Sequence, residues 1–100
     1  MITFVRTVTY AAGKYAEIMT LTRLVKKHLA DKYGIELRAS APFGGGDPSR
    51  VAYSATFDSL AAYEQASLKL LSDQEYLKLL AAYAPHVFTG PMQDQLWRDI

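Results

Sequence analysis

Two histidines are the side chains of this 100-residue chain best suited to acid–base chemistry near neutral pH. An imidazole can take up or release a proton in that range, so it can act as a general base. His28 falls within a long predicted helix, where we interpret it as a surface or interface residue. His86 follows Pro85 at the start of the last segment. For His86, a structural role and a catalytic role near the mouth of a pocket both stay open. The other candidate catalytic residue is Tyr53.

A charged residue interrupts the apolar positions of the first predicted strand, where Arg6 lies between Phe4 and Val8. A charge in the middle of a strand needs a partner, because leaving water without one is costly. One reading pairs Arg6 with Asp94 or Glu36 in a network of the sheet or an interface. The other reading makes Arg6 a candidate ligand-binding residue that holds the carboxylate or enolate of a small molecule.

Aromatic side chains are abundant, at 12% of the chain, and seven of them are tyrosines. Aromatic residues at strand or helix spacing usually belong to a core, but they can also line a mostly apolar ligand pocket. We count Trp97 and Asp94 with Arg6 as candidate ligand-binding residues. Asp94, Trp97 and Arg98 fit equally well in a strand that contacts a partner subunit. The tyrosines considered for the pocket are Tyr10, Tyr53, Tyr63, Tyr76 and Tyr83.

Composition and motifs argue against several functions. The formal net charge of +1 gives no electrostatic reason to expect nucleic acid or an anionic membrane as a partner. The chain has no cysteine, no Ser-His-Asp motif, no nucleotide fingerprint and no paired metal-ligand spacing. We therefore expect no metal and no cofactor, although one histidine would suffice as an axial haem ligand. We see neither a signal peptide nor a membrane-spanning run, and we expect a cytoplasmic protein.

The elements that must position these residues begin with a strand over residues 1–10 and a helix over residues 14–33. The strand places Phe4 and Val8 on one face and Val5 on the other. The helix has apolar residues at spacings of three and four and ends before Gly34, which we expect in the left-handed conformation. Strands are predicted over residues 35–41 and 50–57. The glycine-rich residues 42–50 between them predict a flexible hairpin loop rather than a phosphate site.

The second helical region is predicted to be split near Ser72. Asp58 or Ser59 begins the first piece, and Ser72 and Glu75 have the spacing of a capping box that begins the second. The second piece is expected to end at Pro85. Residues 92–99 are predicted as the fourth strand, after a short extended piece.

The order βαββαβ is that of a ferredoxin-like α+β domain, with one antiparallel four-stranded sheet and both helical layers on one face. We expect a single such domain over residues 1–100. Because the first strand is apolar on both faces, the uncovered face must meet something. A second copy of the chain is the simplest partner, so we expect a homodimer through the open sheet face and the C-terminal strand.

The layout resembles the dimeric α+β barrel superfamily, in particular small NIPSNAP-like domains and antibiotic-biosynthesis-monooxygenase-like domains. The segments that carry this resemblance are ITFVRTVTY at the N-terminus, Tyr33-Gly34, Phe57-Asp-Ser-Leu60, Asp73-Gln-Glu-Tyr76 and Asp94-Gln-Leu-Trp-Arg98. The resemblance implies two subunits with facing sheets and a cavity in each subunit between sheet and helices. It implies no catalytic residue, since no catalytic signature is matched.

Two functional hypotheses follow. The first is a small dimeric protein that binds or converts an aromatic or polyketide-like molecule, as a cofactor-free monooxygenase, cyclase or isomerase would. The second is a structural or regulatory dimer without catalysis. Fold alone does not separate the two hypotheses.

Overall fold

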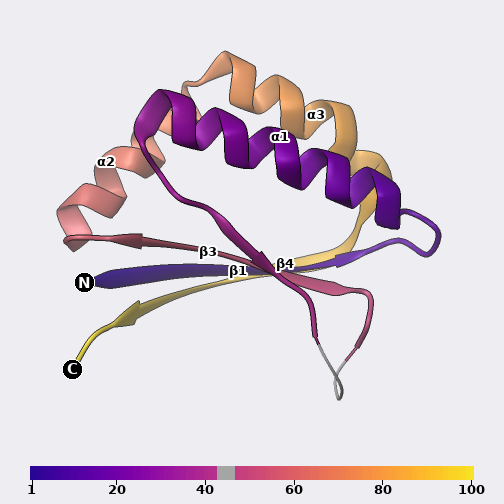
Figure 1. The fold of residues 1–100 in the computed structure, drawn as a ribbon, viewed down its shortest axis with the longest axis horizontal. Helices are drawn as coiled ribbons and strands as arrows, with labels where there is room; N and C mark the ends of the chain where they lie inside the picture. The colour runs from indigo at the N-terminus through magenta and orange to yellow at the C-terminus, as the bar shows by residue number, and fades with distance from the viewer. Residues whose placement is uncertain (43–46) are drawn as a thin grey trace.

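A computed structural model describes residues 1–42 and 47–100 and shows a four-stranded antiparallel sheet with all three helices on one face (Figure 1). The strand order is β2-β3-β1-β4, as expected for a ferredoxin-like fold. The central strand β1 pairs with β3 on one side and β4 on the other. The elements are β1 (Ile2–Tyr10), α1 (Tyr15–Tyr33), β2 (Arg38–Ser40), β3 (Arg50–Phe57), α2 (Leu60–Leu71), α3 (Gln74–Val87) and β4 (Phe88–Arg98).

The alternation of β1 places different residues on the two faces of the sheet. Val8 and Val51 are paired in the sheet and form one core cluster with Ile18 of α1 and Val87 of α3. Side chains that are directly opposite share a face, so the even-numbered residues of β1 face the helices and the odd-numbered residues lie on the open face. Val5 therefore lies on the open face, where Figure 1 shows no helix.

The helical layer packs mainly through α1 and α3. Leu21, Val25 and Leu29 of α1 form a second core cluster, against which Tyr76 of α3 and other partly buried residues pack. In contrast, α2 has no buried residue, and it lies beside the C-terminal end of α1 (Figure 1). Gly34 ends α1 with φ +66°, which confirms the predicted left-handed stop.

The split of the second helical region is confirmed, but the predicted capping residue is wrong. Asp73, not Ser72, is the N-cap of α3, and its Oδ1 accepts a hydrogen bond from the Tyr76 amide at 3.1 Å. Ser72 ends α2, where its hydroxyl donates to the Lys69 carbonyl oxygen at 3.2 Å. Asp and Ser are both good caps, so sequence spacing alone did not separate these adjacent residues.

Three predicted boundaries also move. β2 is shorter than residues 35–41, because Ile35 and Leu37 pack against the α1 cluster instead of extending the strand. α3 continues past Pro85 to Val87, whose side chain is 1% exposed and anchors the last turn in the core. β4 begins at Phe88 rather than at residue 92, and its pairing with β1 shifts in register between Thr7 and Thr9.

The predicted hairpin loop over residues 42–50 falls partly outside the described residues. Residues 43–46 are the part that the structure does not describe. In the described part of the chain, no helix has the length and apolarity needed to cross a membrane.

Candidate functional site

The structure joins two of the predicted site residues in an ion pair on the helix-facing side of the sheet. Arg6 of β1 is directly opposite Asp94 of β4. Its Nε donates to Asp94 Oδ1 at 2.8 Å, and its Nη2 donates to Oδ2 at 3.0 Å. The side chains are 32% and 46% exposed, so the pair is open to solvent. The predicted partnership with Asp94 is thereby confirmed, and Glu36 instead contacts Arg38 at 3.7 Å.

Aromatic rings lie next to this pair. We call Arg6, Asp94, Phe4, Tyr63 and Tyr76 together the Arg6 cluster. The Arg6 guanidinium lies 5.4 Å from the centre of the Phe4 ring, which in turn stacks on Tyr63 of α2 with the ring centres 5.6 Å apart. The hydrogen bonds from Arg6 lower the pKa of Asp94, and the same bonds raise the pKa of Arg6 against the opposing effect of burial. Burial raises the pKa of Tyr76, while the nearby Arg6 charge lowers it. The cluster therefore combines a fixed charge pair with flat apolar surfaces.

Tyr53 lies in the same row of the sheet, directly opposite Arg6 on the other side of β1. Its hydroxyl is 2.8 Å from Thr22 Oγ1 of α1, and the contact is partly buried between helix and sheet. Burial raises the pKa of the Tyr53 phenol, because the charged phenolate would lose its hydration. The phenol is thus held neutral beside the Arg6 cluster.

The other two predicted residues lie elsewhere. Trp97 pairs with Thr3 on the open face, is 60% exposed, and donates to Gln95 Oε1 at 3.3 Å. It is therefore on the opposite side of the sheet from Arg6. His86 is exposed near the C-terminal end of α3. Among the described residues, no hydrogen bond or ion pair links it to Arg6 or Tyr53.

Sequence reasoning missed a second polar cluster, which holds α1 against α3. The Asp73 side chain is only 1% exposed, and its Oδ2 contacts His28 Nε2 at 2.7 Å. The Tyr33 hydroxyl donates to the same oxygen at 2.5 Å, and the Lys32 ammonium lies 3.4 Å from it. These bonds lower the pKa of Asp73 far below its usual range, those from Tyr33 and His28 most strongly. We call these residues the Asp73 cluster.

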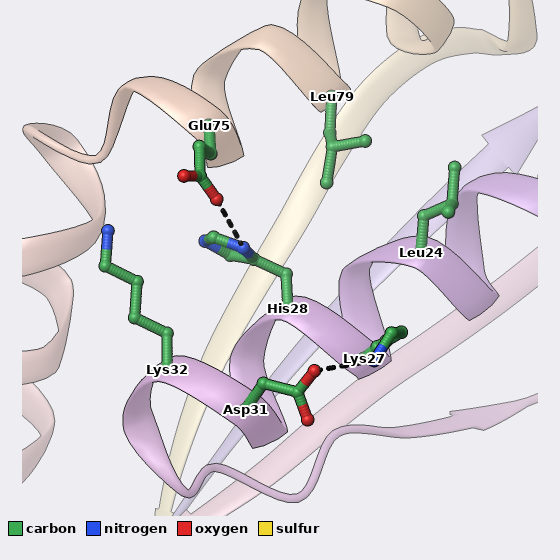
Figure 2. Close-up of a pocket in the computed structure, with 7 residues that line it drawn as sticks. All are labelled: Leu24, Lys27, His28, Asp31, Lys32, Glu75 and Leu79. Atoms are coloured by element: carbon green, nitrogen blue, oxygen red, sulfur yellow. Dashed lines mark hydrogen bonds and ion pairs between the residues drawn. The ribbon is translucent and has the colours of Figure 1, made fainter.

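His28 is half-buried at the contact between α1 and α3, with 11% of its side chain exposed, so of the two predicted positions it occupies an interface, here one between helices. Its ring stacks on Tyr76, and its Nδ1 faces Glu75 Oε2 at 3.5 Å. Figure 2 shows His28 projecting from α1 toward Glu75 of α3. Both residues line a depression of about 510 Å³. Within the described part of the chain, no three acidic, histidine or cysteine residues are grouped to hold a metal ion. The available signal was the spacing of Leu21, Leu24 and His28, which marks a helix face toward a neighbour.

Comparison with known proteins finds relatives by structure alone. No protein-family model and no curated protein matches the sequence. An uncharacterised NIPSNAP domain protein from Burkholderia xenovorans superposes with a TM-score of 0.82 at 16% identity, covering 100% of this chain and 95% of that one. A proposed antibiotic biosynthesis monooxygenase from Nitrosomonas europaea superposes with a TM-score of 0.76 at 12% identity, covering 100% and 99%. The chain thus has the fold that these two groups share, and the predicted likeness to them in fold is confirmed.

Proposed function

We propose that the chain is a homodimeric protein that binds a small aromatic or polyketide-like molecule at the Arg6 cluster, without a metal or nucleotide cofactor. The observation that carries this proposal is the half-open Arg6–Asp94 pair set among aromatic rings. A planar guanidinium recognises carboxylate and enolate oxygens, and rings such as Phe4 and Tyr63 supply flat apolar contacts. Polyketide-like molecules present both kinds of surface.

The location of the cluster supports the same proposal. Leu96, next to Asp94 along the helix-facing side of β4, is 48% exposed, so the helices leave this part of the face uncovered. A ligand lying there would contact apolar carbon at Leu96 and Phe4 and a charge at Arg6. Mostly apolar surroundings with a few placed polar groups are typical of small-molecule sites.

Conversion of the ligand is the finer part of the proposal. Tyr53 is its proposed acid–base group, because the phenol lies in the same row as Arg6 and is held neutral by burial. His86 is a second candidate at the C-terminal end of α3. A monooxygenase, cyclase or isomerase reaction fits a phenol and a guanidinium beside an enolate oxygen. The name of the Nitrosomonas relative supports this reaction class only through the shared fold.

Native mass spectrometry of freshly purified protein followed by a binding titration tests the proposal. The probe is 1,8-dihydroxyanthraquinone, and its visible absorbance is followed during the titration. We expect Arg6→Leu to weaken binding by about tenfold or more, since a charge-assisted contact to the ligand is lost. Arg23→Leu removes an exposed charge from α1 and is the matched control. Equal affinity of the two variants, both folded by circular dichroism, would contradict a site at Arg6.

Two further variants test the proposed acid–base groups. Tyr53→Phe should weaken binding or turnover more than His86→Ala, because only Tyr53 lies beside the cluster. The reverse order would move the site to the C-terminal end of α3.

One observation favours the alternative of a structural or regulatory dimer. Two nitrogens of Arg6 are already bonded to Asp94, so the pair needs no ligand to satisfy it. In that case native mass spectrometry gives a dimer without added mass, and no variant changes probe binding.

A further inference from the structure

A second hollow, of about 560 Å³, lies beside α2 and is not lined by Arg6 or Asp94. Its walls are one side of α2, the C-terminal end of α1 with residues 34–36, and the end of β3. Figure 1 shows these three parts meeting at one end of the molecule. We call this hollow the α2 groove. Its volume is within the range of small-molecule sites.

The sequence of α2 explains why the groove is open. Ala62, Gln65, Ala66 and Lys69 line it, and their spacing places them on one side of the helix. Two of these four side chains are single methyl groups, which cannot fill the space toward α1. This agrees with the absence of any buried residue in α2.

The charges of the groove differ along its length. The Lys32 ammonium lies 3.4 Å from Asp73, the N-cap of α3, and Lys69 lies in the last turn of α2, so both lysines are at the α3 end. Asp58 lies at the other end, directly before the N-cap of α2. Glu36, in the segment between α1 and β2, also lines the groove. The two lysines therefore lie at one end of α2, and the Asp58 carboxylate lies at the other.

We propose that the α2 groove binds a linear zwitterion about the length of a tripeptide, a ligand distinct from that of the Arg6 cluster. Ala62 and Lys69 are separated by seven residues of helix, which is roughly 10 Å at 1.5 Å per residue. An extended tripeptide spans about the same length. Its carboxylate lies at Lys32 and Lys69, its ammonium lies at Asp58, and its middle lies against Ala66. A plain anion would meet the carboxylates, and an apolar molecule would leave the polar walls without partners.

Titration of the ¹⁵N-labelled protein with the tripeptide Gly-Phe-Gly tests this site. We expect amide signals of residues 62–69 and 34–36 to shift in a saturable manner. The N-acetylated peptide and the C-terminally amidated peptide each lack one charge, and each should bind about fivefold more weakly, as expected for an exposed ion pair. Equal binding of all three peptides, or no shift in these residues, overturns the proposal.

Two pairs of variants locate the binding. Ala66→Leu fills the groove and should weaken Gly-Phe-Gly binding by about tenfold or more, whereas Ala61→Leu adds the same side chain at an exposed position outside it. Lys69→Gln should reduce the preference for the free carboxylate, and Lys78→Gln on α3 should not. Equal affinities within both pairs, in variants with native-like spectra, overturn the assignment to the α2 groove.

Discussion

At the scale of single residues, the buried carboxylate of Asp73 connects α1 to α3. Asp73 accepts hydrogen bonds from Tyr33 and the Tyr76 amide, and it contacts His28. A buried carboxylate without such partners would be costly, so these residues depend on one another. The first consequence is a dependence of stability on pH.

The pKa of Asp73 is lower in the folded chain than its ordinary value of 3.8, so the folded state favours the charged carboxylate. This stabilisation is fully present above the ordinary pKa and is lost as the pH falls through the lower, folded value. We expect the urea midpoint of the wild type to fall toward that of Asp73→Asn as the pH is lowered from about 5 to 2. The same comparison at each pH cancels the titration of other groups. A gap that stays constant over this window would contradict the role of the Asp73 charge.

Tyr33 gives a second, smaller prediction at this scale. Its hydroxyl donates to Asp73, and the bond to this carboxylate raises the pKa of the Tyr33 phenol. Tyr33→Phe should lower Tm by a few degrees, roughly the effect of one lost hydrogen bond to a charged group. Tyr15→Phe, at an exposed position of α1, is the control and should leave Tm unchanged. Equal Tm values would mean that the bond contributes nothing.

At the scale of elements, the boundary between α2 and α3 depends on the identity of one cap. Asp73→Ala removes the cap of α3 together with the partner of His28, whereas Ser72→Ala removes only an exposed bond to the Lys69 carbonyl. We expect Asp73→Ala to lower Tm by about 5 °C or more and Ser72→Ala to change it by less than about 2 °C. Thermal unfolding followed by circular dichroism measures both. A larger effect at Ser72 would mean that Ser72 caps α3, as the capping box expected from the sequence requires.

The elements show how far sequence reasoning reached. Apolar spacing of three and four carried it through α1, whose apolar residues form one packed face, and β-branched and aromatic residues carried it through β1. It failed where tertiary contacts decide the local structure. Ile35 and Leu37 alternate like strand residues but pack on α1, and Pro85 suggests a helix end that the burial of Val87 overrides.

The same limit applies to the candidate sites. A partner for Arg6 was predictable, because a mid-strand charge requires one, but the choice of Asp94 over Glu36 depends on the pairing of β4 with β1. The Asp73 cluster was not predictable, since His28 and Asp73 are 45 residues apart and meet only when α1 and α3 pack. Trp97 could not be placed on a face, because the start of β4 and its register shift decide which residues point to the helices.

At the scale of the whole molecule, the helices formed by residues 1–42 and 47–100 all lie on one face of the sheet and leave the other uncovered (Figure 1). The open face carries Val5 at its centre and Trp97, which is 60% exposed. Two copies that placed these faces together under two-fold symmetry would bury Val5 and Trp97 together with the threonine and glutamine side chains around them. This arrangement is the dimer that we propose.

Val5→Lys tests that dimer, because it places an ammonium group at the centre of the open face, between Ser54 and Gln95. Burying this charge against the same charge of the second copy is unfavourable. We therefore expect the dissociation constant of the dimer to rise by at least about tenfold. Sedimentation velocity over a range of protein concentrations measures the change. Ala61→Lys, on the exposed side of α2, adds the same charge away from the face and should stay dimeric. If both variants dimerise like the wild type, the open face is not the interface, and a wild-type monomer would remove the dimer itself.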